Sequence, residues 1–160
     1  RSDGKLLGAQ AVGLDGVDKR IDAFAMALQL GATVYDLEEA ELTYAPQFGS
    51  AKSPVNFAGM VAGDVLRGEM PVAHWADEHP LLLDVRQPAE LEVECVPDVV
   101  NIPLPELRAR LDELPRDREI HVICRSGQRA YYATRVLLQN GFDARTISGG
   151  MLSHANLGVG

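Results

Sequence analysis

The sequence predicts an α/β domain with a doubly wound parallel sheet, preceded by a separate α+β unit. After Pro80, strand-like apolar stretches alternate with helix-like stretches, which is typical of a mostly parallel sheet covered on both faces. These stretches are Leu81–Val85, Glu90–Val93, Val99–Ile102, Leu104–Leu111, Glu119–Cys124, Arg129–Asn140 and Ala144–Ile147. Before Pro80 one strand-like stretch precedes segments with helical spacing. We therefore expect two domains, over residues 1–68 and 81–160, joined by a linker over residues 69–80.

The first domain is expected to contain one strand, two amphipathic helices and a loop that contains proline. Apolar residues recur at three- and four-residue spacing from Val17 to Leu30, and Gly31 stands where a helix C-cap belongs. Two prolines preclude a continuous regular element in the loop. In chain order the expected elements are a strand over Lys5–Val12, a helix over Val17–Leu30, a short acidic turn or helix over Val34–Glu41, a loop over Leu42–Asn56 and a helix over Pro54–Leu66.

The composition argues against several classes of function. The formal net charge of the 160 residues is -8, which does not suit a surface that follows the phosphates of nucleic acid. Apolar stretches such as Leu81–Leu83 are far shorter than the ~20 residues needed to cross a bilayer. The two cysteines, Cys95 and Cys124, form no CxxC pair or Cys/His cluster, so neither a disulfide scaffold nor a metal site is indicated. We expect a cytoplasmic protein that binds neither nucleic acid, nor membrane, nor metal.

The segment from Ile120 onward carries the clearest chemical signal. An apolar strand ends at Cys124, a short loop follows, and an amphipathic helix begins near Arg129. Successive backbone N–H groups in such a loop form an anion-binding concavity at the helix N-terminus, which stabilises a thiolate. Cys124 is therefore the candidate nucleophile, and the alternative is that it is a small buried apolar residue. The candidate ligands of its anionic substrate are Arg125, Ser126, Gly127, Gln128 and Arg129.

Four motifs in this order resemble those of the rhodaneses, over about residues 81–153. They are Asp84-Val85-Arg86, Asn101-Ile102-Pro103, the Cys-x4-Arg loop from Cys124 to Arg129, and Ser148-Gly149-Gly150. The resemblance implies a five-stranded rhodanese-like domain in which Cys124 carries sulfur from thiosulfate or a persulfide as a cysteine persulfide. It also implies that Arg129 and the loop amides bind the anionic sulfur, and that Asp84 and Arg86 are architectural.

Two features of the motifs bear on substrate choice. Phosphatases of the same fold have a loop one residue longer, Cys-x5-Arg, because phosphate needs a wider cradle than sulfur, so a phosphatase is disfavoured. Where rhodaneses commonly have a histidine, this chain has Cys95. Cys95 could resolve a persulfide or disulfide on Cys124, or it could be a packed, inert thiol.

The first domain resembles the C-terminal dimerisation domain of FAD-dependent pyridine nucleotide-disulfide oxidoreductases. The resemblance rests on Leu7–Gly13, Asp18–Asp22 and Tyr44–Asn56, and the last is specific to the branch of coenzyme A-disulfide reductases, NADH oxidases and NADH-dependent persulfide reductases. It implies a partial dimerisation domain, a homodimeric parent and coenzyme A species among the substrates. It also implies that Tyr44 lies toward the partner's flavin-side centre, unless Tyr44 is only a packing aromatic.

The cofactors of that family are not expected to bind to this chain itself. No Gly-x-Gly-x-x-Gly follows a strand, so FAD and NAD(P)H are implied only for a longer parent protein. Residue 1 is an arginine, and we expect the chain to begin partway through that parent. The favoured hypothesis is a sulfurtransferase domain attached to a flavin-dependent reductase. The alternatives are a non-catalytic sulfur-binding or redox-sensing dimer module and, less favoured, a phosphatase.

Overall fold

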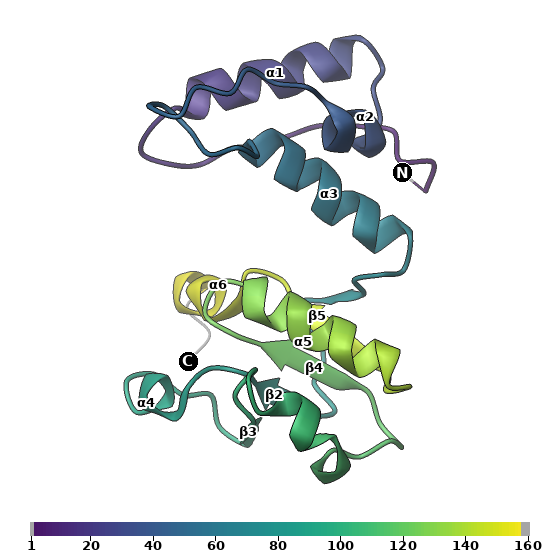
Figure 1. Cartoon of the computed structure of the whole chain (residues 1–160), viewed down its shortest axis with the longest axis vertical. Coiled ribbons are helices and arrows are strands. Elements are labelled where there is room, and N and C mark those ends of the chain that lie inside the picture. The colour runs from purple at the N-terminus through teal and green to yellow at the C-terminus, as the bar shows by residue number, and fades with distance from the viewer. Residues whose placement is uncertain (1, 158–160) are drawn as a thin grey trace. The chain divides into compact units, whose positions relative to one another are not determined.

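The computed structural model describes residues 2–157, and its chain divides into two units between Glu69 and Met70 (Figure 1). The first unit contains three helices, α1 (Val17–Gln29), α2 (Val34–Glu39) and α3 (Pro54–Leu66). Helices α1 and α3 coincide closely with the helices predicted from the spacing of apolar residues, and α2 lies in the segment predicted to be a short acidic turn or helix. The second unit contains a parallel sheet with helices on both of its faces.

Helices α2 and α3 form the packed centre of the first unit. Both begin with a capping box, made by Thr33 with Asp36 and by Ser53 with Asn56. The side chain of Asn56 also donates hydrogen bonds to the carbonyl oxygens of Leu37 (3.0 Å) and Ala40 (2.8 Å) at the end of α2. These bonds satisfy carbonyl groups that have no partner within α2 and so join the two helices.

The strand predicted over Lys5–Val12 is wrong beyond its first residue. Lys5 forms an isolated antiparallel bridge with Thr33, and Leu6 N donates to the Ala32 carbonyl oxygen (3.0 Å). Residues 6–12 are irregular, because no strand in the described part of the first unit lies beside them to extend the ladder. The segment therefore resembles a strand in its sequence but lacks the partner that a strand requires.

The sheet of the second unit has five parallel strands in the order β1-β5-β4-β2-β3. Its strands are β1 (Val72–Ala73), β2 (Leu82–Asp84), β3 (Val99–Asn101), β4 (Ile120–Ile123) and β5 (Ala144–Ile147). The helices are α4 (Pro88–Leu91), α5 (Gln128–Gln139) and α6 (Gly150–Leu157), with 3₁₀ turns η1 (Leu107–Ala109) and η2 (Leu111–Glu113). The five-stranded α/β architecture predicted from the sequence is confirmed.

The segment expected to be a linker, residues 69–80, contains β1, and all of it after Glu69 lies within the second unit. Thr146 N donates to the Pro71 carbonyl oxygen (2.9 Å) and Ser148 N to that of Ala73 (3.0 Å). Met70 and Ala73 are buried. Because β1 adds the edge strand next to β5, this segment is part of the sheet and does not act as a flexible connection.

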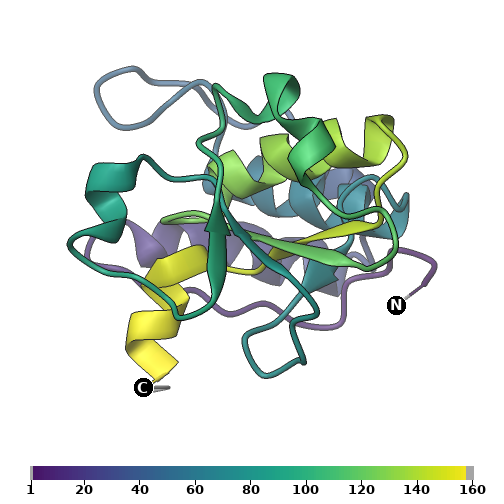
Figure 2. The same cartoon turned by 90° about the horizontal axis from the view of Figure 1, so that it is seen from below.

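The sheet separates two hydrophobic clusters. Leu83 belongs to the cluster that includes α5 and the 3₁₀ turns, whereas Leu82 belongs to the cluster that includes Met151 of α6. Figure 2 shows α5 and the 3₁₀ turns on one side of the sheet and α6 on the other. Strands that are covered on both faces are expected to be buried along their whole length, as β4 is, and three of its four residues are apolar. No helix within residues 2–157 is long and apolar enough to span a membrane.

The helix predicted over Leu104–Leu111 is replaced by η1 and η2. The backbone of Arg110 (φ -122°, ψ 20°) leaves the helical region and interrupts the segment after one turn. Leu107 and Leu114 are nevertheless buried in the cluster beside α5. The spacing of apolar residues therefore correctly predicted that this segment packs against the core. It did not predict that the segment forms 3₁₀ turns in place of a continuous helix.

Candidate active site

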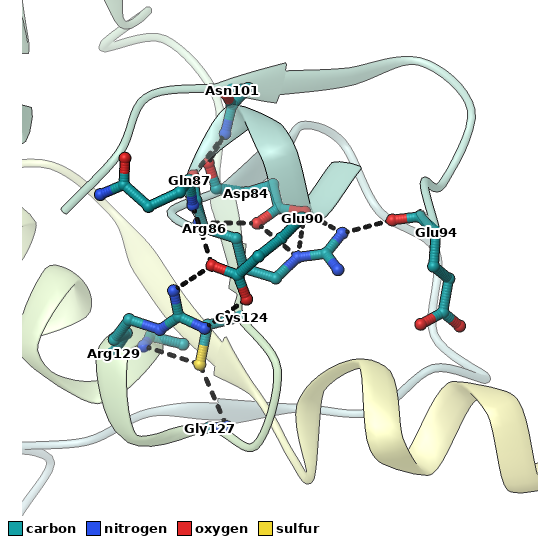
Figure 3. Close-up of polar contacts among 10 residues, drawn as sticks. Asp84, Arg86, Gln87, Glu90, Glu94, Asn101, Cys124, Gly127 and Arg129 are labelled. Carbon is teal, nitrogen blue, oxygen red and sulfur yellow. Dashed lines mark hydrogen bonds and ion pairs between the residues drawn. The ribbon is translucent and has the colours of Figure 1, made fainter. Parts of the chain in front are cut away.

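The thiol of Cys124 lies where β4 ends and the loop toward α5 begins. The residue is buried, with 1% of its surface exposed. Its Sγ accepts hydrogen bonds from the backbone N–H groups of Gly127 (3.2 Å) and Ala130 (3.4 Å) (Figure 3). Ala130 lies in the first turn of α5, so the positive end of the helix dipole also faces the sulfur. Together these groups form an anion-binding concavity around the sulfur.

The loop around Cys124 is shaped by glycines. Gly127 has a positive φ of 101°, which a residue with a side chain rarely adopts, and its N–H group donates to Sγ. Gly150, at the start of α6, approaches the loop from the other side. A Cβ at Gly150 would lie 2.3 Å from the carbonyl oxygen of Cys124. The turn over residues 148–150 therefore supports the loop through close backbone contact.

Backbone hydrogen bonds fix this support. Met151 N donates to the Cys124 carbonyl oxygen (2.9 Å), and Leu152 N donates to that of Arg125 (3.0 Å). The indole Nε1 of Trp75 donates to the carbonyl oxygen of Gly150 (3.0 Å). Sequence reasoning did not identify Trp75, because it lies in the segment that was expected to be a linker.

The five residues predicted to bind the substrate's anionic sulfur have different environments. Arg125, Ser126 and Gln128 are exposed on the loop around the thiol, and Gly127 contributes its N–H group. Arg129 is half-buried and forms a bidentate ion pair with Glu90 of α4, with N–O distances of 2.6 and 2.8 Å. The Arg129 guanidinium holds the pKa of the Glu90 carboxyl at about 2. Hydrogen bonding to Glu90 in turn raises the pKa of Arg129.

Glu90 is a site residue that sequence reasoning missed. The sequence places it at the start of the stretch Glu90–Val93 and predicts no role for it, yet its carboxylate also accepts a hydrogen bond from Gln87 N (3.1 Å) and completes a capping box at the start of α4. The Pro88 that follows Gln87 is the usual first residue of such a helix and was the available signal. Glu90 thus connects α4 to the helix that begins beside Cys124.

Asp84 and Arg86 form a buried ion pair behind the loop. The Arg86 side chain bonds both carboxylate oxygens of Asp84 (2.7–3.1 Å) and the Glu94 carbonyl oxygen (2.9 Å). Asn101 Nδ2 donates to the carbonyl oxygens of Asp84 (2.9 Å) and Arg86 (3.0 Å). These contacts hold the end of β2 in place, as expected for architectural residues.

Cys95 is exposed, so the expectation of a packed thiol is wrong. Its Sγ lies 3.2 Å from the carbonyl oxygen of Val96. Tyr44 lies in the first unit and is also exposed (57%). Within the described part of the chain, no group of three or more His, Cys, Asp or Glu side chains could hold a metal ion.

Comparisons with known proteins concern both units. The Rhodanese-like domain family model matches residues 72–156. A sulfurtransferase of Allochromatium vinosum is 36% identical over 83 residues, which are 51% of this chain and 78% of that protein. A coenzyme A disulfide reductase of Staphylococcus epidermidis is 48% identical over 58 residues, 36% of this chain and 13% of that protein.

Two solved structures resemble most of the chain. Reduced Bacillus anthracis CoADR-RHD is 40% identical, with a TM-score of 0.82, over 86% of this chain and 26% of its own. The NAD-dependent persulfide reductase from A. fulgidus is 38% identical, with a TM-score of 0.77, over 87% of this chain and 26% of its own. The chain thus spans about a quarter of the length of these two relatives.

Proposed function

The chain belongs to the rhodanese-like domain family, and we propose that it transfers sulfane sulfur through a persulfide on Cys124. The observation that carries the proposal is the convergence of two backbone N–H groups and a helix N-terminus on Sγ. The same groups that surround Sγ can bind the terminal sulfur of a Cys124 persulfide once that sulfur has lost its proton. A nucleophile and a pre-formed anion site in one loop are what sulfur transfer requires.

The reaction consists of two displacements at sulfur. The thiolate of Cys124 attacks the outer sulfur of the donor, the new S–S bond forms, and the donor's S–S bond breaks. With thiosulfate the leaving group is sulfite, which takes the bonding electron pair. A thiolate or cyanide then attacks the terminal sulfur of the Cys124 persulfide, and the Cys124 thiolate is the leaving group.

We further propose that this domain serves a flavin-dependent disulfide or persulfide reductase. The likeness to CoADR-RHD and to the persulfide reductase extends over 86% and 87% of the chain, which supports a dimerisation role for the first unit. On this proposal the parent is a cytoplasmic homodimer that binds FAD and NAD(P)H in other domains and handles persulfides or coenzyme A species. Tyr44 would lie toward the partner's active centre.

The decisive experiment is sulfur loading of the purified chain. Incubation with thiosulfate or glutathione persulfide should add one sulfur atom to the intact mass and support sulfur transfer to cyanide. Both should be lost in Cys124→Ser. Cys95→Ser is the matched control, because it removes an exposed thiol outside the loop and should retain both.

Three results would overturn the proposal. If Cys124→Ser still gained sulfur while Cys95→Ser did not, the nucleophile would be Cys95. If the folded wild-type chain bound donor but transferred no sulfur, the sulfur-binding or redox-sensing module would be the better account. Hydrolysis of an aryl phosphate would instead identify a phosphatase.

A further inference from the structure

The charge balance around Cys124 depends on Glu90. Both terminal nitrogens of Arg129 are bonded to the Glu90 carboxylate, at 2.6 and 2.8 Å, which is the fork-to-fork geometry of a strong ion pair (Figure 3). The pKa of Glu90, held at about 2 by this guanidinium, keeps the carboxylate charged at any physiological pH. The positive charge of Arg129 is therefore largely compensated before a substrate arrives.

The other charges nearby leave one uncompensated cation. Asp84 and Arg86 neutralise one another in a buried pair. Arg125 is exposed on the loop, and no carboxylate within residues 2–157 forms an ion pair with it. Beside the Cys124 thiolate, the loop thus presents the charge of Arg125 and the partial charges of its backbone amides.

Donors differ in how much negative charge they bring to this loop. Thiosulfate carries two negative charges, so its encounter complex with the Cys124 thiolate contains three. A hydropersulfide reacts as its protonated form, R–S–SH, which brings none. The thiolate of Cys124 attacks its terminal sulfur, giving Cys124–S–SH and R–S⁻, and the single negative charge moves from Cys124 to the leaving thiolate. Once that thiolate has left, Cys124–S–SH can release its proton, and the loop amides then hold the anionic sulfur.

We propose that Glu90 tunes the loop toward persulfide donors and against thiosulfate, by compensating the charge of Arg129. Glu90 acts through Arg129 and is a positioning residue. The inference rests on the proposed sulfur transfer and adds the class of donor, R–S–SH, that the site prefers. It also explains why an arginine of the Cys-x4-Arg loop is bonded on both terminal nitrogens to a carboxylate from a different helix.

The test compares two donors in Glu90→Gln, thiosulfate and the persulfide of 2-mercaptoethanol, whose organic part is uncharged. Removing the carboxylate frees the charge of Arg129, so KM for thiosulfate should fall about threefold to tenfold, the scale of one partly exposed charge acting on a dianion. The kcat/KM for the persulfide should stay within about twofold. The gain with thiosulfate should shrink at high ionic strength.

Two further variants separate charge from structure. Glu92→Gln removes an equal charge from the residue next to α4 that does not pair with Arg129, and it should leave both donors unaffected. The double variant Glu90→Gln with Arg129→Gln restores the original net charge, so the preference for persulfide should return. A preference that stays altered in the double variant would mean that loosening of α4 is responsible and would refute the proposal.

An unchanged donor ratio in Glu90→Gln would overturn the inference, as would an equal shift in Glu92→Gln. Neither result would affect the proposed function, because sulfur would still load on Cys124. If the wild-type chain transferred sulfur from neither donor, the proposed function itself would fail. Intact mass after incubation with each donor distinguishes these cases.

Discussion

Replacing Gly150 by alanine should damage both the stability of the second unit and the loop that holds Cys124. Gly150 has a φ of 56°, and a Cβ placed there would lie 2.3 Å from the Cys124 carbonyl oxygen and 2.9 Å from the carbonyl carbon and oxygen of Arg125. All three neighbouring atoms belong to the backbone. No side-chain rotation can therefore relieve the contact, and the loop or the start of α6 must move.

The magnitude follows from two contributions. A residue with a side chain in the left-handed region costs about 1–2 kcal/mol. Overpacking that forces a backbone shift adds about 1–3 kcal/mol. Gly150→Ala should therefore lower the free energy of unfolding by about 2–5 kcal/mol. A displacement of about 1 Å at the nucleophile can also reduce turnover about a hundredfold.

Gly141→Ala is the matched control. Gly141 also has a positive φ of 78°, but the nearest atom to its Cβ is a nitrogen of Arg116 at 3.8 Å, an ordinary contact. This variant should lose only the conformational contribution of about 1–2 kcal/mol and should retain sulfur transfer. Urea unfolding and the thiosulfate–cyanide assay measure the two effects. The reasoning is refuted if both variants are equally stable and equally active.

Two more predictions concern buried polar groups. Asp84→Ala leaves the Arg86 charge buried without its partner and should cost about 3–5 kcal/mol in urea unfolding, and a second change, Arg86→Met, should recover much of that loss. Burial and the nearby His121 lower the pKa of His79 below 6.5, so the unfolded chain binds the proton more readily and the stability should fall as the pH drops below about 6.5. His79→Gln should flatten that part of the profile, and a slope unchanged by this substitution would show that another group titrates.

The parts of the fold that could be predicted from the sequence are those determined by local sequence patterns. The strand ending at Cys124 is a short, mostly apolar run, the helix after it has an apolar period, and the loop between them contains the glycine that its backbone conformation requires. The short acidic segment after Thr33 likewise begins with a capping box that is visible in the sequence. Each of these features is decided by neighbours within a few residues.

The parts that could not be predicted depend on partners distant in the sequence. Strand β1 has only two residues, and its identity as a strand comes from β5, more than seventy residues later. The opposite error occurred at Lys5–Val12, where the pattern of a strand was present and a partner was not. Glu90 and Arg129 form an ion pair although they are 39 positions apart, and no periodic pattern in the sequence predicts a pair at that separation.

The geometry around Cys124 also constrains how a sulfur acceptor can reach it. The carbonyl oxygen of Cys124 is fixed by Met151, and its Sγ is held by the amides of Gly127 and Ala130. A residue tied at both its backbone and its side chain cannot carry sulfur to a distant acceptor without breaking these bonds. The acceptor must therefore approach the loop itself, past the exposed side chains of residues 125, 126 and 128. Substitutions at the uncharged Ser126 and Gln128 should change the preference among acceptors, whereas loss of the Arg125 charge should also slow sulfur loading from an anionic donor.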